Sequence, residues 1–484
     1  MTKGPAAVTL ERPRLTTGLA AMGAALLAAC SLAPTQTPPL VPLAASWKST
    51  APAGWVSTEA LRHWQTGHWW RLFGDTELDA LMARVELHNP SLAQALANVA
   101  QADALARQAN AALWPTLGVQ ASTQRSGRPA GGSASAGLSA SWAPDLWGRL
   151  ADTARAQDAN VQASQADLAA ARLAAQGSLA TSYFALRAAD AELALLDDIL
   201  VGYQRAARIT GNRYDVGVAA HTDLLQAHST LASAQASRVA LQGSRDQLEH
   251  AVALLVGVPP AAFDLAPATW ATQVPAVPPE LPAALLLRRP DVAAAERAVA
   301  AANAGIGVAR AAWFPGLNLS VGLGGSAGSL ADLAATPTLA WSLGASLAQT
   351  LLDAGARSAA VDAALAAHQA ASASYRQTAL TAMGEVEDQL TALATLAVQI
   401  EHVRTAADAA AAAEQRIMNS YEAGLADYTS VVTAQASTLT SRRTVMQLQL
   451  QRQQAAIGLI QALGGGWQAP WLDTPNAVQP QETS

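Results

Sequence analysis

Two spacings of apolar residues alternate along this chain, one typical of long helices and one typical of strands. Between Leu150 and Gly211 no proline occurs, and large apolar residues recur every seven positions with a single step of four. At about 1.5 Å per residue this segment predicts a helix of roughly 90 Å, in which the step of four locally unwinds a supercoil. The residues of this heptad pattern are Val161, Leu168, Leu179, Leu186, Leu193 and Leu200.

Further helices are predicted on both sides of this segment. A shorter helix should run from His221 to Val256, after a tight turn. Asp75 to Leu113 is also helical by its pattern, with a break at Asn89-Pro90, because a proline ends one helix and can start the next. The same order returns later, with a long helix marked by Tyr375, Val386, Leu393 and Ile400 and a shorter one from Asp427 to Leu463.

Strict alternation of apolar and polar residues appears in two places and predicts two β-hairpins. In the hairpin at 115–142, the alternating runs 117–122 and 138–142 flank residues 126 to 137, whose Gly, Ser and Pro content predicts a turn. The hairpin at 315–345 has the same form around a Gly-rich loop. One face of each is apolar and the other small or polar, which is the pattern of a membrane β-barrel.

Aromatic residues gather near the ends of these strands. Such a placement fits a girdle at a membrane interface, and it also fits ordinary packing where helices meet a sheet. Both interpretations stay open at this point. The residues concerned are Trp114, Trp142, Trp147, Trp313, Phe314 and Trp341.

The chain is an internal duplication. Pro90 and Pro115 recur 200 positions later as Pro290 and Pro315, and residues from Gly148 onward recur at an offset of 207, so about seven residues are inserted in one loop. A period this long indicates a fused pair of modules and not a solenoid. The predicted organisation is a signal peptide at 1–29, a lipid-anchored extended segment at 30–74, a first repeat at 75–258, a Pro-rich linker at 259–282, a second repeat at 283–466 and a tail at 467–484.

The first thirty residues predict export and lipidation. Basic residues precede a short apolar run, 19–29, which is too short to span a bilayer and indicates a secretion signal. The run ends in Leu27-Ala-Ala-Cys30, which matches the bacterial lipobox, and Cys30 is the only cysteine. We expect Cys30 to be acylated; the alternative is a signal peptide followed by an incidental cysteine. Ser31 stands where a retained lipoprotein has Asp, so the protein is expected in the outer membrane.

Composition excludes several classes of protein. The net charge is −6, with no cluster of Lys and Arg, which argues against nucleic-acid binding. After the signal no eighteen consecutive apolar residues occur, so no transmembrane helix is expected. We found no metal-ligand spacing and no phosphate-binding loop, so neither an enzyme nor a cofactor is expected. Gly324 to Gly328 match a hydrolase motif by letter, but the predicted hairpin loop is the wrong context.

Four motifs resemble those of one family. They are Trp69-Trp-Arg-Leu-Phe-Gly-Asp75, Ala185-Leu-Arg-Ala-Ala-Asp190, Leu287-Arg-Arg-Pro-Asp291 and Gly384-Glu-Val-Glu-Asp-Gln-Leu390. In their order, and with the duplication and the lipobox, they resemble the TolC-like outer membrane factor family, in its NodT-type lipoprotein branch, over residues 60 to 466.

The resemblance implies a mainly α fold with β-strands, assembled as a homotrimer. Four strands from each chain would make a twelve-stranded β-barrel in the outer membrane, above an α-helical barrel in the periplasm. The implied function is the exit duct of a tripartite efflux system for small molecules or drugs. The implied partners are a periplasmic adaptor protein, an inner-membrane pump of the resistance-nodulation-division type, and outer-membrane lipid.

The resemblance also assigns a docking tip for the adaptor, at the turns that join long and shorter helices. Its residues here are Val216, Gly217, Val218, Ala423, Gly424 and Leu425. Glycine permits the positive φ that such a turn requires, and exposed apolar neighbours give a partner a surface to bury. A plain helix C-cap explains the glycine alone.

A gate is implied between the same two turns. In the family, an acidic residue six positions after the first tip glycine pairs with a tyrosine three positions before the second; these are Asp223 and Tyr421 here. Asp223 can equally interact with the dipole at a helix N-terminus. The chain departs from the pattern at Ala426, which replaces a basic residue, and at Thr433, which replaces an acidic one. Asp427 is a possible substitute for that acid.

An alternative function from another class is a periplasmic coiled-coil adaptor or scaffold lipoprotein. An adaptor would carry one helical hairpin flanked by β-rich halves, whereas this chain carries two similar helix sets, each with its own β-hairpin. The exported compound cannot be derived from the sequence.

Overall fold

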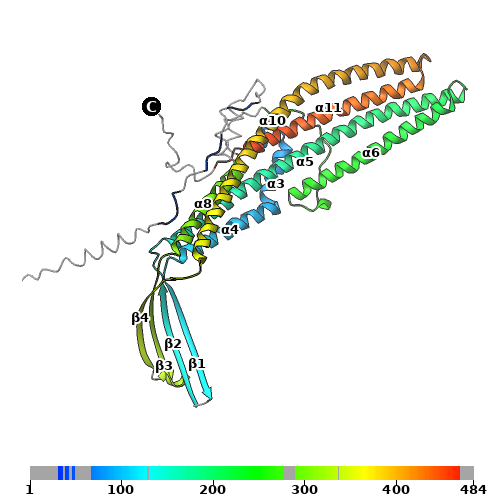
Figure 1. Ribbon diagram of the computed structural model, residues 1–484. Helices are drawn as coiled ribbons and strands as arrows, with labels where there is room; N and C mark the ends of the chain where they lie inside the picture. Colours follow the sequence, from blue (N-terminus) through cyan, green and yellow to red (C-terminus); the bar gives the residue numbers. More distant parts are fainter. Residues whose placement is uncertain are drawn as a thin grey trace, which may run out of the picture. The chain divides into compact units, whose positions relative to one another are not determined.

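The computed structural model describes residues 31–35, 39–42, 46–48, 67–127, 130–275, 289–335 and 337–468. The predicted signal peptide, Cys30 and almost all of the predicted tail lie outside these residues. The elements, in chain order (Figure 1), are η1 (Trp69–Phe73), α3 (Thr76–His88), α4 (Pro90–Ala111), β1 (Thr116–Gly127), β2 (Ala130–Trp142), α5 (Arg149–Asp215), α6 (His221–Leu255), η2 (Pro260–Ala262), α8 (Pro290–Ala311), β3 (Gly316–Ala327), α9 (Leu330–Ala335), β4 (Thr338–Ala348), α10 (Ala356–Glu422) and α11 (Tyr428–Ala462).

The helices of the two repeats match in length. α5 and α10 each contain 67 residues, α6 and α11 each contain 35, and α4 and α8 each contain 22. The predicted long helices are therefore confirmed, and both extend to the residue before their turn. No helix in the described part of the chain has both the length and the apolar character needed to cross a membrane.

The compact units of the structure do not coincide with the sequence repeats. One unit comprises 1–39, 99–163 and 295–375 and holds the β-sheet; the other comprises 40–98, 164–294 and 376–484 and holds the α5–α6 and α10–α11 hairpins. Each unit takes residues from both repeats. Neither repeat therefore builds a core of its own.

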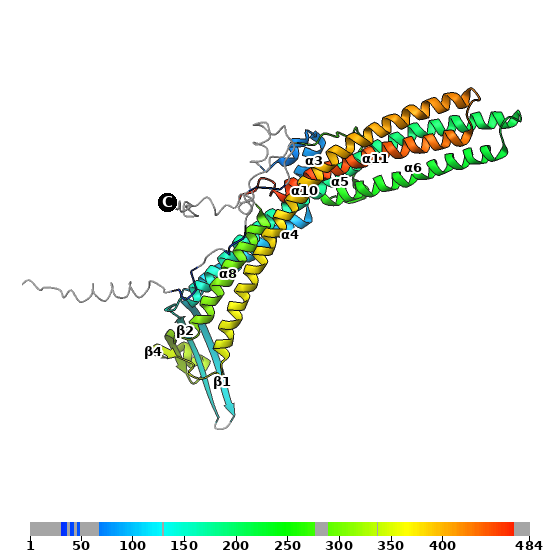
Figure 2. The ribbon, with the colours of Figure 1, turned by 45° about the horizontal axis from the view of Figure 1, so that its top comes forward.

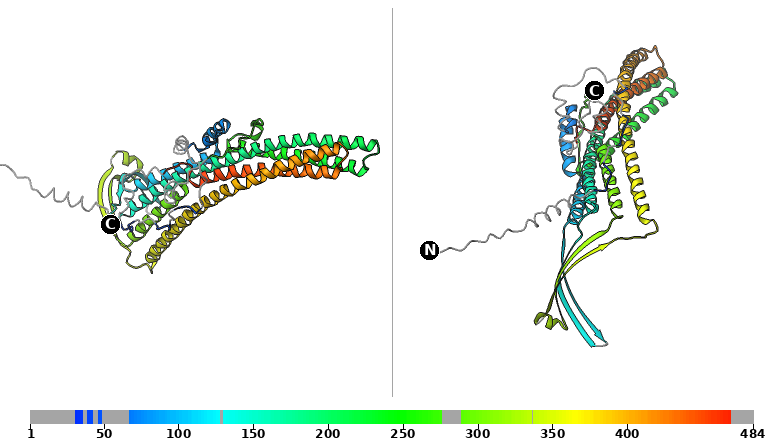
Figure 3. Two further views of the ribbon diagram at one scale, coloured as in Figure 1. Left: turned by 90° about the horizontal axis from the view of Figure 1, so that it is seen from above. Right: turned by 60° about the vertical axis from the view of Figure 1, so that its left-hand side comes forward.

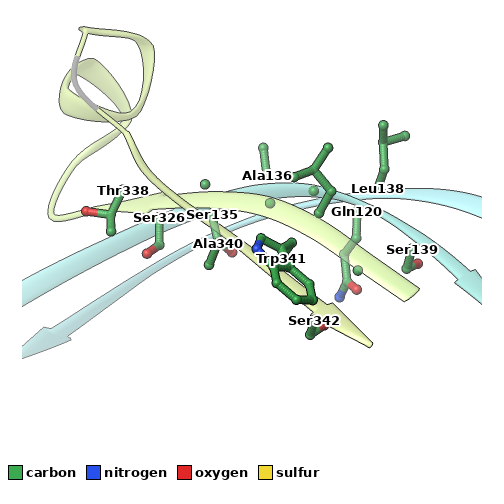
Figure 4. Close-up of a pocket in the computed structure, with 15 residues that line it drawn as sticks. Gln120, Ser135, Ala136, Leu138, Ser139, Ser326, Thr338, Ala340, Trp341 and Ser342 are labelled. Carbon is green, nitrogen blue, oxygen red and sulfur yellow. The ribbon is translucent and has the colours of Figure 1, made fainter. Parts of the chain in front are cut away.

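The sheet has two chemically different faces. Its order is β1-β2-β3-β4 and all neighbouring pairs are antiparallel. The register places Val119, Leu138, Leu323 and Trp341 side by side in one row, and Gln120, Gly137, Gly324 and Ala340 in the next row on the other face. Figure 4 shows Ala136 and Leu138 on one side of the sheet and Gln120 and Ser139 on the other.

A register with period two sends every second residue to the same side, so the two faces differ along most of the sheet. Near the end of β1, the polar residues Thr123 and Arg125 fall on the apolar side. The apolar face carries Leu117, Val119, Leu138, Ala140, Leu317, Leu319, Val321, Leu323, Leu339, Trp341, Leu343 and Leu347. The polar face carries Thr116, Gln120, Ser122, Ser135, Ser139, Ser141, Ser320, Ser326, Thr338 and Ser342. The two-faced hairpins expected from the sequence are confirmed.

The predicted turn at 126–137 is wrong, because most of it is strand. β1 continues to Gly127 and β2 begins at Ala130. Small residues are needed here: a Cβ on Gly137 would lie 3.1 Å from the carbonyl oxygen of Leu323 on the neighbouring strand. The Gly and Ser content that marks loops in soluble proteins therefore marks close strand contact in this sheet.

The second hairpin differs from its prediction in a similar way. β3 continues to Ala327, so the residues that resemble a hydrolase motif begin within a strand and not in a loop. β4 ends at Ala348, three residues beyond the predicted hairpin. The loop between the two strands contains a short helix, α9, which lies at the end of this hairpin remote from the helices (Figure 3).

The aromatic residues near the strand ends divide into two groups. Trp142 Nε1 donates to the carbonyl of Leu113 at 2.9 Å, and Trp147 Nε1 donates to that of Pro315 at 2.8 Å. The Trp147 ring also stacks on Phe314, with 4.6 Å between centroids. These contacts are packing at the corner between helix and sheet. Trp114 and Trp341, by contrast, are 73% and 80% exposed and stay available for a membrane interface.

In the other unit, α5 with α6 and α10 with α11 form antiparallel pairs (Figures 1 and 2). The heptad residues Leu179, Leu186 and Leu200 are buried there. In the second repeat Val386, Leu393 and Ile400 are buried as well. Val161, Leu168 and Leu193 are only half-buried in the single chain.

Charged residues of the sequence motifs form two clusters of ion pairs, one in each repeat, around largely buried arginines. Arg187 is 2% exposed and pairs with Asp190 at 3.0 Å and with Glu77 of α3. Asp190 also accepts from Arg245 of α6 at 3.1 Å. In the second repeat, Arg289 pairs with Asp291 at 2.7 Å and with Glu385 at 2.6 Å. These charged motif residues therefore connect helices of the described structure.

Asp190→Ala should destabilise the fold strongly, because it leaves the buried guanidinium groups of Arg187 and Arg245 without their shared carboxylate. Loss of one partner of a buried ion pair costs about 3–5 kcal/mol. Denaturant titration of the detergent-solubilised protein measures the change. Asp197→Ala is the matched control, since Asp197 pairs with exposed Arg238 on the same face of the bundle and should cost far less; equal losses would refute the role of burial.

Candidate functional site

The two turns between long and shorter helices have the same backbone structure. Gly217 and Gly424 have φ of 75° and 81°, a region that strongly favours glycine. Val218 N donates to the carbonyl of Arg213 at 2.8 Å, and Leu425 N donates to that of Ser420 at 2.8 Å. Both turns are therefore Schellman caps. A helix C-cap therefore explains the backbone conformation of both glycines.

The caps leave apolar side chains in solvent. Val216 and Val218 are each 74% exposed and Leu425 is 83% exposed, and Ala423 is exposed as well. A C-cap requires only the glycine, so it does not account for the two exposed valines beside Gly217 or for the exposed leucine beside Gly424. Exposed apolar groups clustered in this way indicate a contact surface for another molecule.

Equivalent aromatic positions of the two repeats have different surroundings. In the first turn Tyr214 is 39% exposed and its ring lies 5.2 Å from that of His221. In the second turn Tyr421 and Tyr428 are each 3% exposed, with 5.9 Å between their rings. The second pair forms a buried cluster with residues of α5 and α6, namely Ala206, Ala207 and Ala227, and with Val431 of α11.

Tyr421 is fixed by side chains of α5. Its hydroxyl shares a hydrogen bond of 2.8 Å with Thr210 Oγ1, and Thr210 is completely buried. Arg213 Nη2 donates to the carbonyl oxygen of Tyr421 at 2.6 Å, and the guanidinium lies 4.5 Å from the centre of the Tyr421 ring. The last turn of α10 is thus bound by a residue of the first repeat.

A second arginine of α5 reaches the same helix end. Arg205 Nη2 lies 2.7 Å from Glu422 Oε1, in an ion pair that is largely open to solvent. Such exposed pairs contribute little, about 0–1 kcal/mol, whereas a hydrogen bond from a charged group contributes about 1.5–3 kcal/mol. Arg213 is therefore the stronger link between the two turns.

Asp223 lies beside this cluster but is not hydrogen-bonded to Tyr421 in the described part of the chain. It is half-buried in the first turn of α6. Burial raises the pKa of Tyr428 to about 12, and the negative charge of Asp223 contributes to that rise. Asp223 therefore acts electrostatically on Tyr428, and within one chain the predicted bond from Asp223 to Tyr421 is not seen.

The remaining predicted gate residues lie along one groove of about 370 Å³ between α10 and α11, which both Asp427 and Thr433 line. Asp427 is the N-cap of α11 and accepts from Ser430 N at 2.7 Å, and the hydrogen bonds from Ser430 hold its pKa below the usual value. The Thr433 hydroxyl donates to the carbonyl of Thr429 at 2.9 Å. Ala426 packs against the aromatic cluster.

Sequence reasoning missed Thr210, Arg205 and Arg213. Ala426 removes the basic residue expected in the second turn, yet Arg213 brings a positive charge to that turn from the first one. A signal was present in the sequence, because basic side chains near helix ends bind free carbonyl groups. From the sequence, however, Arg213 would be expected to bind carbonyl groups of its own helix end, whereas it binds the carbonyl of Tyr421 in the other repeat.

Arg213→Gln should loosen the end of α10. Loss of about 1.5 kcal/mol raises local opening about tenfold, which hydrogen exchange of the amides around residues 418–425 will measure. Arg208→Gln is the matched control, since Arg208 is an exposed arginine of the same helix. Unchanged exchange in Arg213→Gln would show that the arginine does not hold this turn.

Comparison with known proteins identifies the family. The model of the outer membrane efflux protein family matches this chain twice, at residues 81–258 and 281–465. The pyoverdine export outer membrane protein OpmQ of Pseudomonas aeruginosa is 32% identical, over 92% of this chain and 95% of its own. The cation efflux system protein CusC of Escherichia coli K12 is 30% identical, over 91% and 97%.

Solved structures agree with the sequence relatives. The outer-membrane channel OprN superimposes with a TM-score of 0.82 at 28% identity, over 90% of this chain and 100% of its own. The resemblance inferred from the motifs is confirmed, and with it the α-helical barrel with a β domain and the location in the outer membrane. The chain belongs to the outer membrane efflux protein family.

Proposed function

We propose that this chain is the exit duct of a tripartite efflux system and works as a homotrimer. Membership of the family establishes an outer-membrane efflux channel, and the adaptor or scaffold alternative is therefore wrong. The observation that supports the homotrimer is the sheet, which has one apolar face, one polar face and two free edges.

The free edges require partner strands. In the described sheet β1 pairs only with β2, and β4 only with β3. Open strand edges are not tolerated in lipid, because their backbone groups have no water to bond with. Four strands are too few to close on themselves, since single-chain barrels begin at eight. Three copies give twelve strands, with the apolar face toward lipid and the serine-rich face toward an aqueous lumen.

Leu323→Arg should impair barrel assembly, because it puts a charge on the face assigned to lipid. The cost at mid-bilayer is about 2–4 kcal/mol. Gln120→Arg is the matched control in the adjacent row of the opposite face and should be tolerated. Heat-modified gel mobility of outer-membrane fractions reports assembly. If the control failed as badly as Leu323→Arg, the assignment of faces would be wrong.

The turns are assigned as the docking tip for a periplasmic adaptor. The supporting features are the exposed Val216, Val218 and Leu425 beside the two caps, with Ala423 next to Gly424. The adaptor in turn connects to an inner-membrane pump, of the resistance-nodulation-division type by resemblance. Transported compounds are small molecules or ions, as the names of OpmQ and CusC say of those proteins.

Gly424→Trp should abolish efflux while the barrel still assembles. Its positive φ excludes most side chains, and an indole would cover the apolar surface. Gly243→Trp is the control, because a Cβ at Gly243 on α6 meets open space. Efflux is measured by drug susceptibility in a strain that lacks its own channel.

Crosslinkers at Val218 and Leu425 should capture the adaptor; capture of other copies alone would count against docking.

The gate is assigned to the cluster around Tyr421. Within one chain Tyr421 is held by Thr210 and Arg213, and Asp223 lies near Tyr428. We assign to Asp223, in the closed ring, a contact with the second turn of an adjacent copy. Contacts of about 1.5–3 kcal/mol each, repeated in three copies, are enough to hold a closed state.

Asp223→Ala combined with Tyr421→Phe should raise single-channel conductance in planar bilayers and admit large antibiotics, because both substitutions remove polar contacts of the closed turns. Asp198→Ala, an exposed acid further up α5, serves as control. Conductance at the wild-type level would move the gate to the groove that Asp427 and Thr433 line.

Lipidation of Cys30 completes the proposal. Its support is the lipobox and the absence of any other cysteine from the sequence. A single acyl chain binds membranes only marginally, so stable anchoring takes the two or more chains that lipoprotein processing supplies.

A further inference from the structure

The insertion that distinguishes the second repeat from the first forms the loop between β3 and β4, which contains the short helix α9. This helix packs on β2 and β3, the two inner strands of the sheet. Ala134 of β2 is completely buried, whereas every other described residue of the four strands is exposed or half-buried. In the register Ala134 is on the same side as Leu138, so the loop covers part of the apolar face.

Glycines on that face leave the space that the loop occupies. A Cβ on Gly325 would lie 3.0 Å from Pro337 Cβ and 3.8 Å from Leu333 Cδ1 of α9. A Cβ on Gly132 would lie 2.9 Å from the carbonyl oxygen of Gly328, just before the helix. Neither strand glycine has a positive φ, so the backbone itself does not require glycine there. The close approach of the loop requires it.

Figure 4 agrees with this placement. The coiled segment that precedes β4 lies on the same side of the sheet as Ala136 and Leu138. Ser139 and Gln120 point to the opposite side. The helix therefore lies against the apolar face and leaves the polar face open.

The inner strands have a short apolar surface of their own. Their last large apolar side chains toward the loop are Leu138 and Leu323. From Leu317 to Leu323 the strand rises about 20 Å, which at the usual tilt spans roughly 15 Å of membrane, whereas the apolar band of a membrane barrel is about 25 Å tall. The residues that follow on this face are Ala136, Ala134, Gly132, Gly325 and Ala327.

The helix brings large apolar side chains to the level where the strands lack them. Leu333 contacts the Gly325 position, and Leu330, one turn earlier on the same side of the helix, is 67% exposed. Asp332 is on the opposite side by the helical period. Ser329 Oγ accepts from Asp332 N at 3.2 Å and donates to the Asp332 carboxylate at 2.8 Å, which fixes the start of the helix.

We propose that α9 is an interfacial anchor that extends the apolar band of the barrel into the outer leaflet, with Leu330 among the lipid acyl chains and Asp332 toward water. This inference rests on the proposed barrel. The helix lies at the end of the sheet remote from the helices (Figure 3), which extend into the periplasm, so the leaflet beside it is the outer one.

Lipid is the occupant that the position of the helix favours. Neighbouring copies pair with the free edges of β1 and β4, whereas α9 packs on the two strands between them. The surface that Leu330 and Leu333 present is also continuous with the face assigned to lipid. A second copy of the chain is therefore a weaker candidate for covering this helix.

Arg125 of β1 marks the level of the lipid head groups. It pairs with Gly132 in the register, falls on the apolar side of the sheet and is exposed. A long basic side chain in such a place extends its charge to the interface, where a charge on the lipid face of a barrel costs only about 0–1 kcal/mol. The acyl region thus ends near the row of Gly132, beside the start of α9.

The test attaches the fluorophore NBD to single cysteines and quenches it from either phase. The full chain is reconstituted in phosphatidylcholine vesicles in which part of the lipid carries a nitroxide near the top of an acyl chain. Leu330→Cys should lose most of its emission to the nitroxide and little to aqueous iodide, because an interfacial helix places its apolar face about 5–10 Å into the boundary. Asp332→Cys, on the other side of the helix, should show the reverse. The unaltered chain gives the background from Cys30.

A substitution under the helix tests its seat. Gly325→Leu, added to Leu330→Cys, should displace the loop, so quenching by the nitroxide should fall and quenching by iodide should rise. Gly127→Leu is the matched control at the same end of the sheet, because a Cβ there meets open space. Heat-modified gel mobility checks that each variant still assembles, and the single-cysteine measurements stand without these variants.

The outcomes separate the anchor from the barrel. Iodide quenching of Leu330→Cys as strong as that of Asp332→Cys would refute the anchor. Protection from both quenchers would show that a neighbouring copy covers the helix, and would refute its contact with lipid. Unchanged quenching after Gly325→Leu would refute the seat on the glycine row. Leu323→Cys and Gln120→Cys report on the two faces of the sheet: nitroxide quenching at Gln120, or its absence at Leu323, would refute the barrel itself.

Discussion

A sheet in lipid must satisfy every backbone hydrogen bond, and much of this structure depends on that requirement. Four strands with free edges at β1 and β4 cannot meet it within one chain. The proposed homotrimer meets it by pairing the free edges of neighbouring copies, and half-buried heptad residues such as Val161, Leu168 and Leu193 leave surfaces for those neighbours. The duplication provides the four strands of the sheet, because each repeat contributes one hairpin.

Stability within the single chain comes from another source. Large side chains such as Trp69, Phe73 and Phe184 are buried where the N-terminal elements meet α5, and buried ion pairs connect the helices beside them. Arg187, Asp190 and Arg245 are the clearest case. A buried network of this kind is costly when one member is lost, which ties the positions of α3, α5 and α6 to one another.

The duplicated turns show how one backbone can acquire two roles. Gly217 and Gly424 make equivalent caps, but Tyr214 is exposed whereas Tyr421 is buried against α5. The first turn thus supplies the side chains that bind, and the second supplies the groups that are bound. This asymmetry links the two turns directly, through Arg213 and the carbonyl of Tyr421.

The sequence by itself determined the elements and the family. Heptad spacing gave the long helices, alternation gave the two-faced hairpins, and four motifs with the duplication identified the relatives, because these features follow from local periodicity. It failed at residues 126–137, where glycine and serine in a strand look like a turn. It also could not find the link from Arg213 to Tyr421, or the hydrogen bond from Ser31 to Asp152. Those contacts join residues more than 100 positions apart. The packing of one repeat against the other brings Arg213 to Tyr421, and the packing of the N-terminal segment against the first repeat brings Ser31 to Asp152.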